Sequence, residues 1–175
     1  MSDGYPVPVE VRRFRSDDGE RVRALNEEAM ATTPEYDPDL PDEDLREVKA
    51  TYLDGEGEFL VGVGDDGTIV GMGAYALPSE WLGEFVPIDD QTAELARMRV
   101  DPECHGQGIG SAIYRELARR ARQDGYEQFV LNTGVENDVA RGFYEQLGFQ
   151  LQQEVSIESG AVTFELALYQ KSVQT

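Results

Sequence analysis

The segment 105–110, with sequence HGQGIG, constrains the fold more than any other part of the chain. Residues 92–100 before it are predicted to form a strand, and residues 108–124 after it a helix with apolar side chains every four positions. Glycine tolerates positive φ angles and close backbone approach, and the first turn of a helix presents N–H groups that lack intrahelical partners. A strand, a glycine-rich turn and a helix in this order predict a site for a phosphate.

The distribution of charge supports a phosphate site at this turn. The chain has 35 Asp plus Glu against 15 Lys plus Arg, a net charge of -20, yet Leu95 to Arg122 holds six Arg and three acids. A chain this acidic is repelled by nucleic acid and by anionic lipid, and no run of 18 apolar residues is present. The sequence therefore predicts no nucleic-acid partner and no membrane partner.

The basic residues are almost all arginine, since Lys49 and Lys171 are the only lysines. In molar salt the Debye length falls to about 3 Å, so dispersed carboxylates no longer repel one another strongly. The composition resembles that of haloarchaeal proteins, and we hypothesise a halophilic source; an ordinary acidic protein is the alternative. The first residues lack the pattern of a signal peptide, and Cys104 is a lone cysteine, so a cytoplasmic location is expected.

The hydrophobic pattern predicts an α/β domain over residues 7–175, preceded by a flexible tail at residues 1–6. The expected strands are 7–14, 59–64, 68–77, 92–100, 129–131, 149–157 and 161–169. The expected helices are 16–30, 43–53, 108–124 and 137–147. Residues 78–91 are expected to be irregular, and the aromatic side chains of Tyr36, Trp81 and Phe85 are candidates for the wall of a cleft.

The glycine turn resembles three phosphate-binding motifs to different degrees. A P-loop needs Lys and then Ser or Thr after its last glycine, where this chain has Ser111 and an alanine. A dinucleotide-binding fingerprint needs glycine at position 111 and a parallel sheet that starts near the N-terminus, and this fits poorly. The third motif, Arg/Gln-x-x-Gly-x-Gly/Ala, is similar to the segment, with His105 at the first position and Gly108 and Gly110 at the others.

This third motif belongs to the GNAT N-acetyltransferases, and the resemblance continues downstream. Asn137-x-x-Ala-x-x-Phe-Tyr-Glu-x-x-Gly-Phe resembles the second signature of the family, about 30 residues after the turn, and the order of predicted elements also matches. The resemblance implies a mixed, mostly antiparallel sheet of about seven strands with about four helices. It also implies direct transfer of an acetyl group from acetyl-CoA to an amine in a ternary complex, through a tetrahedral intermediate, without a metal.

The resemblance assigns specific residues to acetyl-CoA. Backbone groups of Met98 and Val100 would hold the pantetheine arm, and amides of the turn would hold the pyrophosphate. The full set of cofactor residues is Met98, Val100, His105, Gly106, Gln107, Gly108, Ile109, Gly110, Ser111, Asn137 and Arg141. Asn137 is expected to cap its helix in any case.

Two residues are candidates for proton transfer. Tyr144 matches the general acid of the family, and a phenol of pKa about 10 can protonate a thiolate of pKa about 8.5; a core tyrosine is the alternative. Glu94 is a candidate base, placed on the same strand face as Met98 by alternation; a surface carboxylate is the alternative. An ammonium of pKa about 10.4 and a carboxyl of about 4.3 are poorly matched, so such a base needs a relaying water or a raised pKa.

Two other functions remain open at this point: an acetyl-CoA-binding regulatory module without turnover, and a nucleotide-binding domain. The acceptor is expected to be a small-molecule or peptide amine. A homodimer is compatible with the resemblance.

Overall fold

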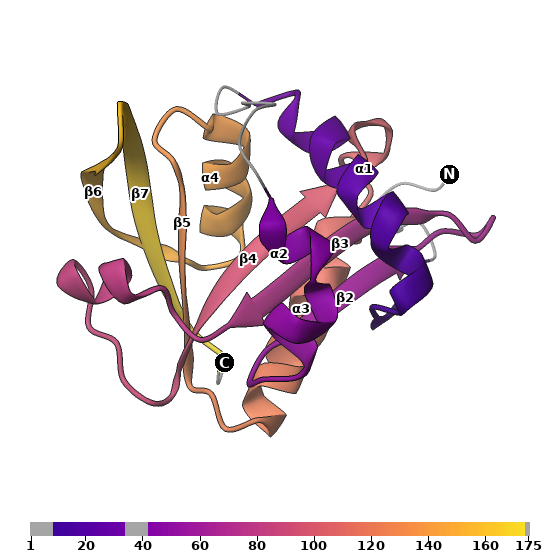
Figure 1. Cartoon of the computed structure of the whole chain (residues 1–175), viewed down its shortest axis with the longest axis horizontal. Coiled ribbons are helices and arrows are strands. Elements are labelled where there is room, and N and C mark those ends of the chain that lie inside the picture. The colour runs from indigo at the N-terminus through magenta and orange to yellow at the C-terminus, as the bar shows by residue number, and fades with distance from the viewer. Residues whose placement is uncertain (1–8, 34–41, 174–175) are drawn as a thin grey trace.

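The computed structural model describes residues 9–33 and 42–173, so the expected tail at residues 1–6 and Tyr36 lie outside the described residues. A single seven-stranded sheet has the order β1-β2-β3-β4-β5-β7-β6 (Figure 1). Its strands are β1 (Glu10–Arg13), β2 (Glu58–Val63), β3 (Ile69–Ala76), β4 (Thr92–Val100), β5 (Gln128–Gly134), β6 (Gln150–Ser159) and β7 (Val162–Ser172). All neighbouring strands are antiparallel except β4 and β5, which confirms the predicted mixed sheet.

Four α-helices are present in the described part of the chain: α1 (Gly19–Met30), α2 (Glu43–Arg46), α3 (Ile109–Gln123) and α4 (Asp138–Gln146). Short helical turns are η1 (Ser16–Asp18), η2 (Lys49–Leu53), η3 (Glu80–Glu84) and η4 (Pro102–Cys104). The expected helix 43–53 is interrupted, because Glu47 leaves the helical region at φ -136°. Segment 78–91 is less irregular than expected, since it contains η3, which buries Leu82 completely.

The two faces of the sheet are covered by different elements. On one face, α3 and α4 pack with the sheet in a core that includes Ile113, Leu117, Phe129 and Tyr144. On the other face, α1, α2 and η2 cover β2 and β3, while η3 covers β5 and β7 (Figure 1). The apolar stripe of α3 explains its position, because Ile109, Ile113, Leu117 and Ala121 are all buried, as predicted.

The sheet opens between its two central strands. β4 and β5 pair only from Thr92–Gln128 to Glu94–Val130. Beyond these three pairs the strands separate, and α4, which packs on the α3 face, is seen between them in Figure 1. β5 instead follows β7 along its whole length. The opening leaves the C-terminal part of β4 beside α4, and this part of β4 leads into the glycine turn.

Candidate functional site

The glycine turn has the geometry that its sequence predicts. Gly106 and Gly108 have φ angles of 80° and 81°, in the left-handed region, and Gly108 is the N-cap of α3. The Ala112 N–H donates to the Gly108 carbonyl at 3.0 Å. The N–H groups of residues 109–111 precede this bond and point out of the first turn of the helix. They form a donor cluster at the positive end of a 15-residue helix.

Gly110 allows the first turn of α3 to approach α4 closely. A Cβ atom at this position would lie 3.1 and 3.2 Å from two ring atoms of Phe143, and 3.5 Å from a methyl group of Val100. The glycine thus brings the turn, the end of β4 and α4 together around the opening of the sheet. His105 is exposed at the start of the turn.

A β-bulge lies in β4 beside the opening. Met72 pairs with Arg99 and Ala74 with Ala96, so two residues, Arg97 and Met98, lie opposite Gly73. Arg97 has φ 58° and is the only non-glycine residue with positive φ in the described part of the chain. A left-handed conformation of a non-glycine residue costs about 1–2 kcal/mol.

The bulge overturns one prediction. Alternation along an ideal strand puts residues 94 and 98 on one face, but the extra residue of the bulge reverses the order. The Met98 side chain packs into the α3 core, where it occupies the space above Gly73. Glu94 faces the other side of the sheet, under the segment that begins at Ser79. The prediction that Glu94 and Met98 share a face is therefore wrong.

Glu94 is held by two neighbours that sequence analysis did not find. The Ser79 N–H and hydroxyl donate to one carboxylate oxygen at 2.8 and 2.9 Å, and the Asn132 amide lies 3.4 Å from the other. Burial raises the pKa of Glu94, while the bonds from Ser79 oppose this shift. No sequence signal connects these three residues, because they come from a loop and two separate strands.

Tyr144 lies in the aromatic core on the α3 side of the opening. It is 8% exposed, and its ring centroid is 5.3 Å from that of Phe143 and 5.7 Å from that of Phe149, both edge to face. Tyr144 and Glu94 therefore lie on opposite faces of the sheet, beside the same opening. Ala140, Phe143 and Leu147 of the same helix are partly buried against this core, whereas Val139 is 73% exposed. The role of Tyr144 as an acid stays a prediction.

Two further predicted residues lie on or next to α4. The Asn137 side chain accepts from the Ala140 N–H at 3.1 Å, so its role as a cap is confirmed. The Arg141 guanidinium donates to the Tyr169 hydroxyl, the Val135 carbonyl and the Glu154 carboxylate at 3.0, 2.9 and 3.1 Å. A phosphate contact of Arg141 would require an exchange of these bonds.

Cys104, next to His105, does not form an activated nucleophile. Burial raises the pKa of its thiol, and Asp101 and Glu103 raise it further.

Within residues 9–33 and 42–173, no group of three or more His, Cys, Asp and Glu is arranged to bind a metal ion. No helix of the described part is both long and apolar enough to cross a bilayer.

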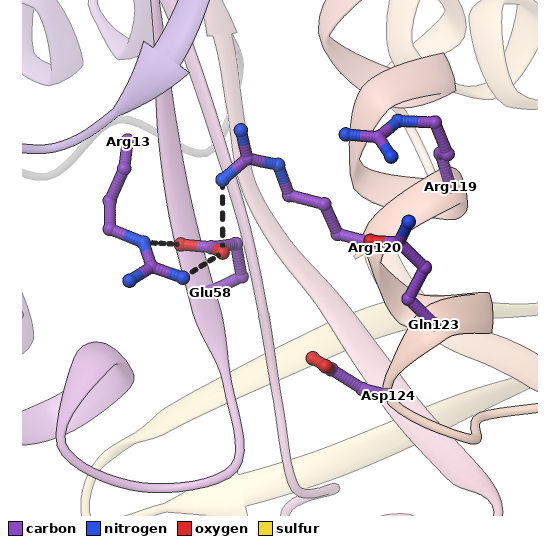
Figure 2. A pocket seen from close by; sticks show the side chains of 6 residues that line it. All are labelled: Arg13, Glu58, Arg119, Arg120, Gln123 and Asp124. Atoms are coloured by element: carbon purple, nitrogen blue, oxygen red, sulfur yellow. Dashed lines mark hydrogen bonds and ion pairs between the residues drawn. The ribbon is translucent and has the colours of Figure 1, made fainter.

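A pocket of about 160 Å³ lies at the other end of α3 (Figure 2). Its lining residues are Arg13, Glu58, Arg119, Arg120, Gln123 and Asp124. Glu58 is 3% exposed and binds Arg13 through two hydrogen bonds of 2.9 and 2.7 Å and Arg120 through one of 3.2 Å. Asp124 accepts a hydrogen bond from the Tyr75 hydroxyl. The charged groups at the base of this pocket thus pair with one another.

Comparison with known proteins identifies the family of this chain. The family model described as Acetyltransferase (GNAT) family matches residues 22–149, which include both signatures. The chain belongs to the GNAT acetyltransferase family. It is 35% identical over 107 residues to N-acetyltransferase family 8 member 2 of Rattus norvegicus, which covers 61% of this chain and 45% of the relative. It is 29% identical over 112 residues to N-acetyltransferase 8 of Homo sapiens, with the same two shares.

The chain spans about half the length of the curated relatives it matches. Solved structures show the same fold at low identity. An acetyltransferase of the GNAT family from Staphylococcus aureus Mu50 has a TM-score of 0.75 and 16% identity, over 95% of this chain and 100% of the other. A GNAT superfamily phosphinothricin acetyltransferase from Sinorhizobium meliloti, in complex with AcCoA, has a TM-score of 0.72 and 19% identity, over 94% and 88%.

Proposed function

We propose that this protein is an N-acetyltransferase that moves an acetyl group from acetyl-CoA directly to an amine in a ternary complex. The observation that carries this proposal is the position of the glycine turn, which lies at the end of β4, where the sheet opens beside α4. The family membership and the acetyl-CoA bound to a structural relative support it.

The glycine turn fits a diphosphate by its chemistry. The N–H groups of residues 109–111, at the N-terminus of α3, have no intrahelical hydrogen-bond partner. A helix N-terminus of this kind is a common site for phosphate. A Cβ at Gly106 would meet nothing within 4 Å, so the turn is open on that side. Backbone groups of Met98 and Val100 would bind the pantetheine arm along the opening. Bound acetyl-CoA supplies an activated acetyl thioester.

The environment of Glu94 suits the role of the base. Burial raises the pKa of Glu94, and this narrows its mismatch with an ammonium group. Glu94 would accept the proton of the amine, directly or through water, from the face of the sheet that α1 covers. Tyr144 would hold a proton on the α3 side of the opening and give it to the leaving sulfur.

A screen for thiol release tests the proposal. Acetyl-CoA is mixed with a panel of small amines, amino acids and peptides, while its binding is measured in parallel by calorimetry. We expect binding without an amine and thiol release with at least one acceptor class. Binding without release across the panel would favour the regulatory module, for which the tight aromatic packing of Tyr144 is the supporting observation. Failure to bind would contradict both.

The acidic surface determines the buffer for this screen. We propose that the protein is halophilic, because its net charge of -20 strains the folded state in dilute buffer by self-repulsion. The melting temperature is expected to rise with KCl up to about 2 M, where charges are screened within a few ångströms. A flat or falling curve would indicate an ordinary acidic protein. A cytoplasmic location and the formation of a homodimer are part of the same proposal.

A further inference from the structure

Arg97, at the β-bulge of β4, is held by an extended network on the α1 face of the sheet. Its guanidinium donates to both oxygens of Asp44 at 2.9 and 2.7 Å and to Asp42 at 2.9 Å. Asn26 lies 3.4 Å from the same guanidinium and also donates to Asp42 at 3.1 Å. The Arg97 side chain is 18% exposed. β4 is thus tied to both α1 and α2 at the bulge.

Two further contacts extend this network. The Tyr52 hydroxyl donates to Asp44 at 2.7 Å, which fixes the carboxylate from the side of η2. Arg99 donates to Asn26 at 2.9 Å and, through a second nitrogen, to the Met98 carbonyl at 3.0 Å. The network therefore reaches the backbone of a residue that the proposed function assigns to acetyl-CoA.

The backbone conformation of residue 97 must be stabilised by contacts with other residues. Its φ of 58° is unfavourable for a side chain with a Cβ atom, and such a conformation persists only where the surrounding structure fixes it. On the α3 face, Met98 fills the space above Gly73. On the α1 face, the paired carboxylates hold the Arg97 side chain. These two sets of contacts hold the adjacent side chains of Arg97 and Met98 on opposite faces of the sheet.

We propose that Arg97 is a positioning residue for acetyl-CoA. Its ion pairs with Asp44 and Asp42 hold the left-handed backbone at residue 97, and the resulting bulge presents the backbone of Met98 and Val100 to the opening of the sheet. Without the ion pairs, residue 97 relaxes toward an ordinary extended conformation and the register of residues 98–100 shifts. This inference rests on the proposed function, because it assumes that β4 binds the pantetheine arm.

Two ligands separate the inference from the proposed function. Adenosine 3′,5′-bisphosphate probes the phosphate-binding turn alone, and acetyl-CoA probes the turn and β4 together. Arg97→Gln is expected to weaken acetyl-CoA binding by about tenfold, as expected for a binding surface that has lost its preorganisation, and to leave the nucleotide unaffected within about twofold. Arg97→Gly is expected to keep more affinity than Arg97→Gln, because glycine adopts the left-handed conformation without strain.

The chain provides a matched control in Arg12. Arg12 lies on β1, three strands away from β4 in the sheet. Its side chain is 19% exposed and donates two hydrogen bonds to Asp18, at 2.8 and 3.1 Å. Arg12→Gln removes a similar ion pair, so it measures the structural cost alone. It is expected to lower the melting temperature while both ligands bind normally. Asp42→Asn, at a more exposed position of the Arg97 network, is a milder second variant, with an expected loss of about threefold in acetyl-CoA affinity.

The outcomes are distinct. If Arg97→Gln and Asp42→Asn bind acetyl-CoA as tightly as the unaltered protein, the positioning role is wrong while the proposed function stands. If Arg97→Gly binds no better than Arg97→Gln, the ion pairs do not act through the backbone conformation, and the inference also fails. If the unaltered protein binds neither ligand, the proposed function itself is wrong.

Discussion

The two ends of α3 are both polar, but the hydrogen-bond donors at the N-terminal end lack side-chain partners among the described residues and those at the C-terminal end are paired. At the N-terminal end, the donors are backbone N–H groups behind two left-handed glycines, and no side chain caps them. At the C-terminal end, the donors are the guanidiniums of Arg119 and Arg120, which bind Glu116, and Arg120 also binds Glu58 (Figure 2).

This difference indicates which end binds a ligand. A guanidinium that already binds a carboxylate must lose that partner before it can bind an anion. This is costly for Arg120, because its partner Glu58 is buried. Backbone donors at a helix start have no such competitor in the glycine turn. The end with fewer charged side chains is therefore the better anion site, and the arginine-rich end is expected to contribute to stability.

The largest expected effect comes from Gly108→Arg at the N-terminal end. The new side chain is strained at φ 81°, and it disturbs the donor cluster. Acetyl-CoA affinity is expected to fall by at least about 100-fold, roughly 2.7 kcal/mol, measured by calorimetry. Arg119→Gln, at the other end of the helix, is the control and should retain affinity. Unchanged acetyl-CoA binding by Gly108→Arg would show that the glycine turn does not bind the diphosphate.

Tyr144→Phe tests the chemistry beside the same end of α3. If Tyr144 protonates the leaving sulfur, kcat falls by about 100-fold, while the dissociation constant of acetyl-CoA changes by less than about twofold, because only one hydroxyl is lost. Tyr114→Phe is a matched control, since its buried hydroxyl has no hydrogen-bond partner among the described residues. Equal turnover of the two variants would leave Tyr144 with a structural role only.

Glu58→Gln tests the C-terminal end. Glu58 receives three hydrogen bonds from two guanidiniums, and charged hydrogen bonds of this kind make the loss of the carboxylate cost about 2 kcal/mol of unfolding free energy. Urea unfolding measures this loss. Acetyl-CoA affinity is expected to stay the same, and a clear decrease would show that the two ends are coupled.

Glu94→Gln is expected to lower kcat/KM by about tenfold and to stabilise the fold above the ordinary pKa of glutamate. Burial raises the pKa of Glu94, so the folded state holds a proton that the unfolded state releases. The unaltered protein therefore loses stability as the pH rises from the ordinary pKa of glutamate to the raised pKa of Glu94, and the variant does not. Unfolding at a series of pH values checks the sign, and an unchanged kcat/KM would exclude Glu94 as the base.

The smallest expected effect concerns Glu116 at the C-terminal end. Hydrogen bonds from Arg119 and then Arg120 lower the pKa of Glu116 to about 2. Its contribution to stability is present above pH 4.5, the ordinary value, and is lost as pH falls toward 2. Glu116→Gln should lack this part of the acid dependence, in an amount limited by solvent screening. Identical acid curves for the two proteins would contradict the shifted pKa.

Much of the fold could be predicted from local sequence. The hydrophobic period of α3, the turn at Gly108 and the cap at Asn137 are each decided within a few residues, and the structure confirms them. The environment of Glu94 could not be predicted in this way, since its partners Ser79 and Asn132 are separated from it by 15 and 38 residues.

The amino-acid sequence by itself determined the order of elements, the mixed sheet and the conformation of the glycine turn, because backbone preferences and hydrophobic periods are local properties. Only the tertiary structure decided the face of Glu94 and the partners of Arg97. The bulge in β4 depends on the space above Gly73 on one side of the sheet and on Asp44 on the other. Contacts between residues this far apart reverse a strand alternation that no local pattern indicates.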